Sequence, residues 1–153
     1  MILGRTPDGS LHEGALAALL GYRLAQAAVI TSAVFDQQMS DALALKPVEF
    51  SALALIHGNP GAGPAQLAQA LSISRPLITQ CLDRLESRGL VQRTPKPSDG
   101  RGLEVNCTGA GRRAVTDALR RLADAEAQAL AGLSRAEQGM LLELLGKAAR
   151  RPA

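Results

Sequence analysis

Residues 75–108, RPLITQCLDRLESRGLVQRTPKPSDGRGLEVNCT, carry the clearest structural pattern of the chain. Apolar residues recur every three or four positions over residues 75–89, which predicts an amphipathic helix that Ser74 caps and Gly89 ends. Two short runs, 90–94 and 103–107, then flank an Asp-Gly pair, which is typical of a β-hairpin turn. We therefore expect a helix followed directly by a two-stranded hairpin.

Two more helices are predicted just before this segment. Pro47 suits the first turn of a helix that ends near Gly58, and Pro64 opens another over 64–71. The order helix, helix, short turn, helix, hairpin is that of a winged helix-turn-helix, predicted over residues 46–108. Such a lobe suits DNA, because a helix about 10–12 Å in diameter fits a major groove about 12 Å wide.

The flanks of this lobe are predicted to be helical. Residues 12–45 carry apolar residues at helical spacing, a fifth helix is expected over 109–131 after Thr108, and Ser134 with Glu137 forms a capping box before a last helix. The flanks are more apolar than one small lobe can bury, so residues 10–45 and 109–153 are predicted to form a helical dimerisation region. The expected fold is mainly α with a small two-stranded β wing, in a single domain over 1–153.

Composition excludes several classes of protein. The chain has a net charge of +3, but residues 72–113 hold eight Lys and Arg against four Asp and Glu, which favours a polyanionic partner. It has two cysteines and two histidines without metal-ligand spacing, no cofactor motif and no catalytic set, so we expect no metal, no cofactor and no enzyme activity. No membrane span or secretion signal is recognised, which favours the cytoplasm.

The helix over 75–89 has two predicted faces. Its apolar side contains Leu77, Ile78, Cys81, Leu82 and Leu85. Its polar side and first turn supply the candidate DNA-binding residues Ser74, Arg75, Pro76, Thr79, Gln80 and Arg84. Arginine and glutamine side chains can bond guanine or adenine edges, and the N–H groups of a first helical turn suit a phosphate.

Residues 67–115 resemble the DNA-binding segment of the MarR family of bacterial transcription regulators, and with the long first helix and the two last helices the resemblance covers nearly all 153 residues. The matching positions are Leu67, Leu71, Ser74, Asp83, Arg84, Leu85, Gly89, Leu90, Val91, Arg93, Asp99, Arg101, Thr108 and Gly111. The resemblance implies a homodimeric regulator, most simply a repressor, bound to a pseudo-palindromic DNA operator. Lys46 departs from the Ser or Thr that commonly caps the second helix of the family, which predicts a frayed helix start.

The resemblance also implies roles for the wing. Arg101 would enter the minor groove, where a narrow A/T-rich groove concentrates negative potential. Asp99 would orient Arg101, and Arg93 and Lys96 would contact phosphates. Family members commonly bind a small aromatic or carboxylate effector, for which the candidate residues here are Tyr22, Arg23, Phe50, His57 and Arg112.

Two alternatives stay open at this point. A winged helix can act as a protein–protein adaptor without sequence-specific DNA binding, because a fold does not fix a function. A redox-responsive regulator that uses Cys81 or Cys107 is the other. An outward-facing basic wing aligned with a polar helix favours DNA over an adaptor, and a cysteine on the packed side of a helix normally behaves as a small apolar residue.

Overall fold

The computed structural model describes residues 4–39, 43–96 and 102–150, which form two compact units. We call residues 38–121 the wing unit, and residues 1–37 with 122–153 the terminal unit. The elements of the wing unit are α2 (Pro47–Gly58), α3 (Pro64–Ala70), α4 (Arg75–Ser87), β1 (Val91–Pro95) and β2 (Leu103–Cys107). The terminal unit contains a 3-10 helix (Gly14–Ala18), α6 (Arg135–Ala148) and all but the end of α1 (Leu20–Met39), whose residues 38 and 39 belong to the wing unit. The helix α5 (Gly109–Ala129) begins in the wing unit and ends in the terminal unit.

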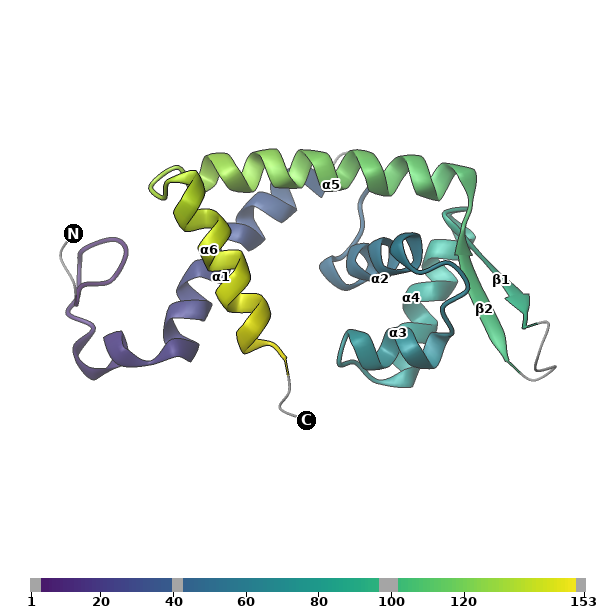
Figure 1. The fold of residues 1–153 in the computed structure, drawn as a ribbon, viewed down its shortest axis with the longest axis horizontal. Helices are drawn as coiled ribbons and strands as arrows, with labels where there is room; N and C mark the ends of the chain where they lie inside the picture. The colour runs from purple at the N-terminus through teal and green to yellow at the C-terminus, as the bar shows by residue number, and fades with distance from the viewer. Residues whose placement is uncertain (1–3, 40–42, 97–101, 151–153) are drawn as a thin grey trace. The chain divides into compact units, whose positions relative to one another are not determined.

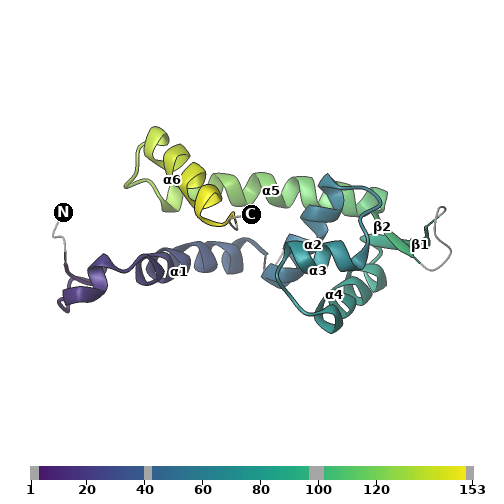
Figure 2. The ribbon, with the colours of Figure 1, turned by 60° about the horizontal axis from the view of Figure 1, so that its bottom comes forward.

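The wing unit has the predicted mainly α architecture with one two-stranded sheet. Figures 1 and 2 show α2, α3 and α4 gathered together beside the β1–β2 hairpin. The strands pair antiparallel, with Val91 opposite Cys107 and Arg93 opposite Val105. A short bridge between Ala62 and Val105 attaches the α2–α3 connection to the outer edge of β2. The helix-turn-helix and the wing are therefore one packed structure.

Local chemistry explains where the helices begin. The Ser74 hydroxyl accepts the Leu77 N–H of α4, and the Thr108 hydroxyl accepts the Gly111 N–H of α5. Ser134 and Glu137 form the predicted capping box of α6. Gly89 ends α4 with a φ of +67°, a left-handed conformation that favours glycine.

The start of α2 differs from the prediction. Lys46 was expected to leave this helix frayed, but the Glu49 carboxylate accepts the Lys46 backbone N–H at 3.0 Å. Pro47 occupies the first turn, where its missing N–H costs nothing. Glu49, the third residue of α2, therefore caps the start of this helix, and the prediction of a frayed start was wrong.

The core of the wing unit is aliphatic. Its most deeply buried side chains include Leu53, Ile56, Leu67, Ile78, Leu82, Leu85, Val91, Val105 and Val115. Leu77 was expected on the buried, apolar side of α4, but 39% of this residue is exposed, so it lies at the edge of that side.

The N-terminal helical region is divided. Residues 12–45 have helical apolar spacing, yet Leu19 adopts an extended conformation between the 3-10 helix and α1. Arg23 crosses this break, because its Nε donates to the Ala17 carbonyl and its guanidinium pairs with the buried Glu13 carboxylate at 2.8 Å. The fifth helix ends at Ala129, two residues earlier than predicted.

Candidate nucleic-acid interface

The first half of α4 presents a polar face to solvent. Arg75, Thr79 and Gln80 are exposed. The Thr79 hydroxyl donates to the Arg75 carbonyl at 3.0 Å, which uses its proton and leaves its oxygen able to accept a hydrogen bond. The helix is anchored from its other side by Ile78, Cys81, Leu82 and Leu85, which are all buried. The geometry therefore offers one arginine, one hydroxyl and one carboxamide together on a helix that is held from behind.

The start of α4 has the form of an anion site. Ser74 and Pro76 are exposed at the first turn, and Pro76 has no N–H to leave unpaired. The remaining N–H groups of a first turn and the helix dipole favour negative charge. A phosphate contact at this turn stays a prediction.

Of the predicted wing residues, only the base of the hairpin is described. Lys96 is exposed directly after β1, and its backbone N–H donates to the Gly102 carbonyl at 2.8 Å. Asp99 and Arg101 lie outside the described residues. Their predicted roles at the minor groove are therefore still predictions.

Arg93 has a different environment from the one expected of a phosphate contact. Its Nε donates to the Glu86 carboxylate at 2.9 Å, and its terminal nitrogen pairs with Asp83 at 2.8 Å. Its backbone N–H also donates to Glu86 at 3.0 Å, and only 24% of its side chain is exposed. Hydrogen bonds from Arg93 lower the pKa of the Glu86 carboxyl, and those bonds raise the pKa of Arg93. In this structure Arg93 joins β1 to α4.

Arg84 is also held by an acidic partner. Its guanidinium donates to Glu49 at 2.7 Å, although 56% of the Arg84 side chain stays exposed. Glu49 is buried, which by itself raises the pKa of its carboxyl, but the Lys46 amide and the Arg84 guanidinium lower it overall. Arg84 therefore links α4 to the start of α2 and keeps part of its side chain in solvent.

Sequence reasoning missed the acidic residues of these ion pairs as site components. Glu49 could have been found, because a glutamate three residues after position 46, the N-cap that precedes Pro47, is the acidic half of a capping box. Glu86 carries no such local signal, since its pairing with Arg93 requires the chain to reverse at Gly89. Glu49 joins α4 to the start of α2, and Glu86 joins α4 to β1, so both hold the elements of the candidate interface together.

The predicted effector residues are divided between the two units. Tyr22 and Arg23 belong to the terminal unit, where both contact Glu13. Phe50 is in the core of the wing unit, His57 is half-buried in the last turn of α2, and Arg112 donates to the Cys107 carbonyl at 2.8 Å. Their role as effector residues stays a prediction.

The two cysteines are buried within the wing unit. Burial raises the pKa of both thiols, which keeps them protonated at neutral pH. Cys107 contacts the Leu53 carbonyl through its Sγ at 3.8 Å. These environments are those of small apolar residues rather than of reactive thiolates.

Within the described parts of the chain, no group of three or more His, Cys, Asp or Glu side chains could hold a metal ion. The helices described here are all too short or too polar to cross a membrane.

These features define a winged helix-turn-helix protein with an exposed polar helix face. The family model that matches the chain is that of the MarR family, over residues 45–103. The transcriptional repressor CouR, solved bound to a 23-mer DNA duplex, has a TM-score of 0.82 and 35% identity, and the match covers 92% of this chain and 99% of that one. This chain belongs to the MarR family of transcription regulators.

Other relatives agree with this assignment. A Mycobacterium tuberculosis MarR family protein in complex with salicylic acid has a TM-score of 0.69 and 30% identity, with 86% of this chain and 97% of that chain covered. A Thauera aromatica protein named for a regulatory role at the hcr operon is 28% identical over 145 residues, which are 93% of this chain and 87% of that protein.

Proposed function

We propose that this protein is a sequence-specific DNA-binding transcription regulator that acts as a repressor. The observation that carries the proposal is the exposed face of α4, where Arg75, Thr79 and Gln80 lie together on a helix fixed from behind. A bidentate contact to a base edge discriminates by about 1–3 kcal/mol, so this face can distinguish sequences. The DNA-bound state of the similar repressor CouR supports the same use of the fold.

The regulator acts as a homodimer on a pseudo-palindromic operator. One lobe reads only a few base pairs, and half-sites one DNA turn apart require two lobes related by a two-fold axis. The terminal unit supports this, since it exposes large apolar side chains on α1 and α6, among them Leu20, Leu24, Val29, Ile30, Met140, Leu142 and Leu144. Exposed apolar surface of this extent marks an interaction site.

The protein acts without catalysis, in the cytoplasm, where its operator lies. A small aromatic or carboxylate effector releases it from DNA by favouring the conformation that binds DNA less well. The salicylic acid complex of a similar family member supports a ligand of this class.

Fluorescence anisotropy tests the proposal directly. The purified protein is titrated onto the duplex that lies upstream of its own gene and onto a scrambled duplex, at low and at physiological salt. We expect tight, salt-sensitive binding that prefers the native duplex, because phosphate neutralisation releases counterions. Gln80→Ala is expected to lose that preference, whereas Gln128→Ala, an exposed substitution on α5, is the matched control and keeps it.

Two results would contradict the proposal. Absence of binding even at low salt would make the adaptor function the better explanation. Equal effects of the two glutamine substitutions would show that the α4 face does not read the sequence. The dimer is tested separately by size-exclusion chromatography with light scattering, where Leu142→Glu is expected to shift the protein toward the monomer.

A further inference from the structure

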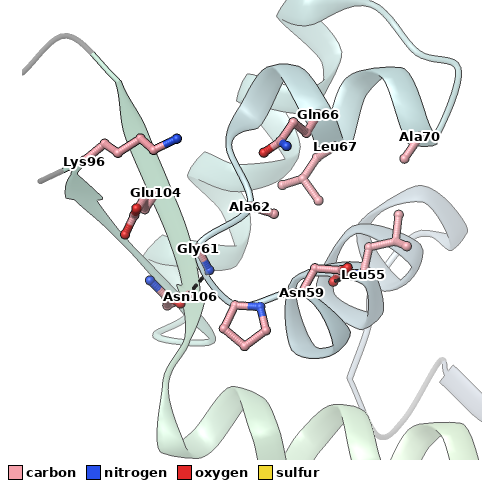
Figure 3. Close-up of a pocket in the computed structure, with 11 residues that line it drawn as sticks. Leu55, Asn59, Gly61, Ala62, Gln66, Leu67, Ala70, Lys96, Glu104 and Asn106 are labelled. Carbon is pink, nitrogen blue, oxygen red and sulfur yellow. Dashed lines mark hydrogen bonds between the residues drawn. The ribbon is translucent and has the colours of Figure 1, made fainter. Parts of the chain in front are cut away.

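A cleft of about 710 Å³ lies within the wing unit, where β2 passes the connection between α2 and α3. Figure 3 shows its two ends. The end at the wing is lined by the polar side chains of Lys96, Glu104 and Asn106, and the end between the helices by Leu55 and Leu67. Its volume is within the range of about 300–1,000 Å³ that is typical of small-molecule sites. The cleft therefore has a polar end and an apolar end.

Three carboxamides of the cleft are fixed by bonds to the backbone. Asn106 accepts the Gly61 N–H at 2.9 Å, and Gln66 accepts the Gly63 N–H at 2.9 Å. Each therefore uses its oxygen and leaves its NH₂ group, a double donor, without a partner among the described residues. Asn59 is fixed in the opposite sense, since its NH₂ donates to the Leu55 carbonyl at 2.9 Å and its oxygen remains an acceptor.

The polar end also contains one charge of each sign. The Lys96 ammonium extends from the wing toward Gln66, as Figure 3 shows. The Glu104 carboxylate lies against Gly61, where a Cβ on this glycine would be 3.7 Å from the Glu104 carboxyl carbon. Among the described residues neither charge has an ion-pair partner, so the end of the cleft can bind an anionic and a cationic group together.

We propose that this cleft binds a small zwitterion of the α-amino-acid class with an apolar side chain. Its carboxylate is bound by Lys96 and by the NH₂ groups of Gln66 and Asn106. Its ammonium group is bound by Glu104, and its side chain contacts Leu55 and Leu67. A pure anion would make no bond to Glu104, and a pure cation would make none to Lys96 or to the two NH₂ groups, so each would use only part of the polar end.

The ligand would act on the wing. The α2–α3 connection is attached to β2 by the Gly61–Asn106 bond and by the Val105 N–H, which donates to the Ala62 carbonyl at 3.0 Å. A ligand in the cleft bridges these segments and pairs with Lys96, which removes a cation predicted to contact a DNA phosphate. This consequence rests on the proposed function as a DNA-binding regulator: the ligand weakens DNA binding, and DNA weakens ligand binding by the same factor.

Isothermal titration calorimetry on the full-length protein without DNA tests the site. The probes are L-leucine, L-isoleucine and L-phenylalanine. Leucinamide, which lacks the carboxylate, and 4-methylpentanoate, which lacks the ammonium group, are the matched analogues. We expect one site per chain for at least one amino acid and binding at least about tenfold weaker for both analogues of leucine, because each leaves a charge unpaired. Binding of none of the three amino acids, or equal binding of leucine and its analogues, would overturn the proposal.

Substitutions locate the site. Glu104→Gln and Lys96→Gln are each expected to weaken amino-acid binding about tenfold or more, at opposite ends of the zwitterion. Glu143→Gln in α6 is the matched control and leaves binding unchanged. Thermal melts establish that each variant is folded. Retention of full affinity by both cleft variants would place the ligand elsewhere and overturn the proposal.

Anisotropy on the native duplex separates this inference from the proposed function. If the ligand-free protein does not bind DNA, the proposed function fails, while the calorimetric result on the site still stands. If DNA binds and no amino acid does, the inference alone fails. If both DNA and the amino acid bind, we expect the amino acid to weaken DNA binding by the wild-type protein and not by the Glu104→Gln variant. Unchanged DNA affinity in saturating amino acid would overturn the coupling.

Discussion

Replacing Arg93 with glutamine tests whether this arginine positions the wing or contacts DNA. In the structure its guanidinium is bound to Glu86 on one side and to Asp83 on the other, and its side chain is only 24% exposed. A residue in this environment joins two elements of the lobe. Arg93→Gln is therefore expected to lower the melting temperature and to weaken DNA binding by loosening the wing.

The melting temperature and the salt dependence of DNA binding together distinguish the two roles. Each phosphate contact contributes about −0.9 to the slope of log K against log salt concentration, so loss of one contact per chain from a homodimer makes the slope shallower by about 1.8. A direct phosphate contact by Arg93 predicts this shallower slope with an unchanged melting temperature. Positioning by Arg93 predicts a lowered melting temperature, and any change in slope then comes from the displaced wing, which carries the predicted contacts of Lys96 and of Arg101, the latter about 1–3 kcal/mol in each half-site.

The assay is a series of anisotropy titrations at four or more salt concentrations, together with a thermal melt of each variant. Lys96→Gln is the matched comparison, because Lys96 is exposed and is predicted to contact a phosphate. It should give the shallower slope with an unchanged melting temperature. If Arg93→Gln gives that same pair of results, Arg93 contacts DNA and the reasoning from its ion pairs is refuted.

Three further predictions concern stability and reactivity. Folding lowers the pKa of the buried Glu49 carboxyl. The stability that this carboxylate contributes is therefore complete above its unfolded pKa of about 4.3 and is lost as the pH falls through the folded pKa. The melting temperatures of wild type and Glu49→Gln should converge in that acid range. A Cβ on Gly111 would lie 1.9 Å from the Leu90 carbonyl oxygen, so Gly111→Ala should lower the free energy of unfolding in urea by about 3 kcal/mol or more. Gly139 on α6 faces open space, so Gly139→Ala should instead raise the free energy of unfolding by about 0.5–1 kcal/mol. Cys81 should react with iodoacetamide at pH 7.5 far more slowly in the native protein than in urea, and equal rates would contradict its burial.

Features that depend on a few neighbouring residues were predictable from the sequence. The caps at Ser74 and Thr108 and the β2 strand follow from short-range chemistry, and each is found where it was expected. The resemblance to the MarR family depended on the same short segments, and the comparisons confirm it.

Features that depend on contacts between distant residues were not predictable. The apolar spacing continues through Leu19, so nothing local marks the break that the Glu13–Arg23 pair stabilises. Arg93 was assigned to a phosphate through the family resemblance, and nothing local showed its partner Glu86, which approaches only after the chain has turned at Gly89. A cationic side chain near a predicted interface is ambiguous until the acidic residues around it are placed.

The ion pairs divide α4 into two functional halves. The second half is held by Glu49 through Arg84 and by the wing through Asp83 and Glu86, whereas the exposed Arg75 and Gln80 lie in the first half. Basic residues counted from the sequence therefore overestimate the phosphate contacts, since Arg93 is neutralised within the lobe and Arg84 partly so. It follows that the salt slope of DNA binding should be smaller than the eight basic residues of 72–113 suggest. Substitutions in the second half should alter affinity through the orientation of α4, and those in the first half should alter which sequence is preferred.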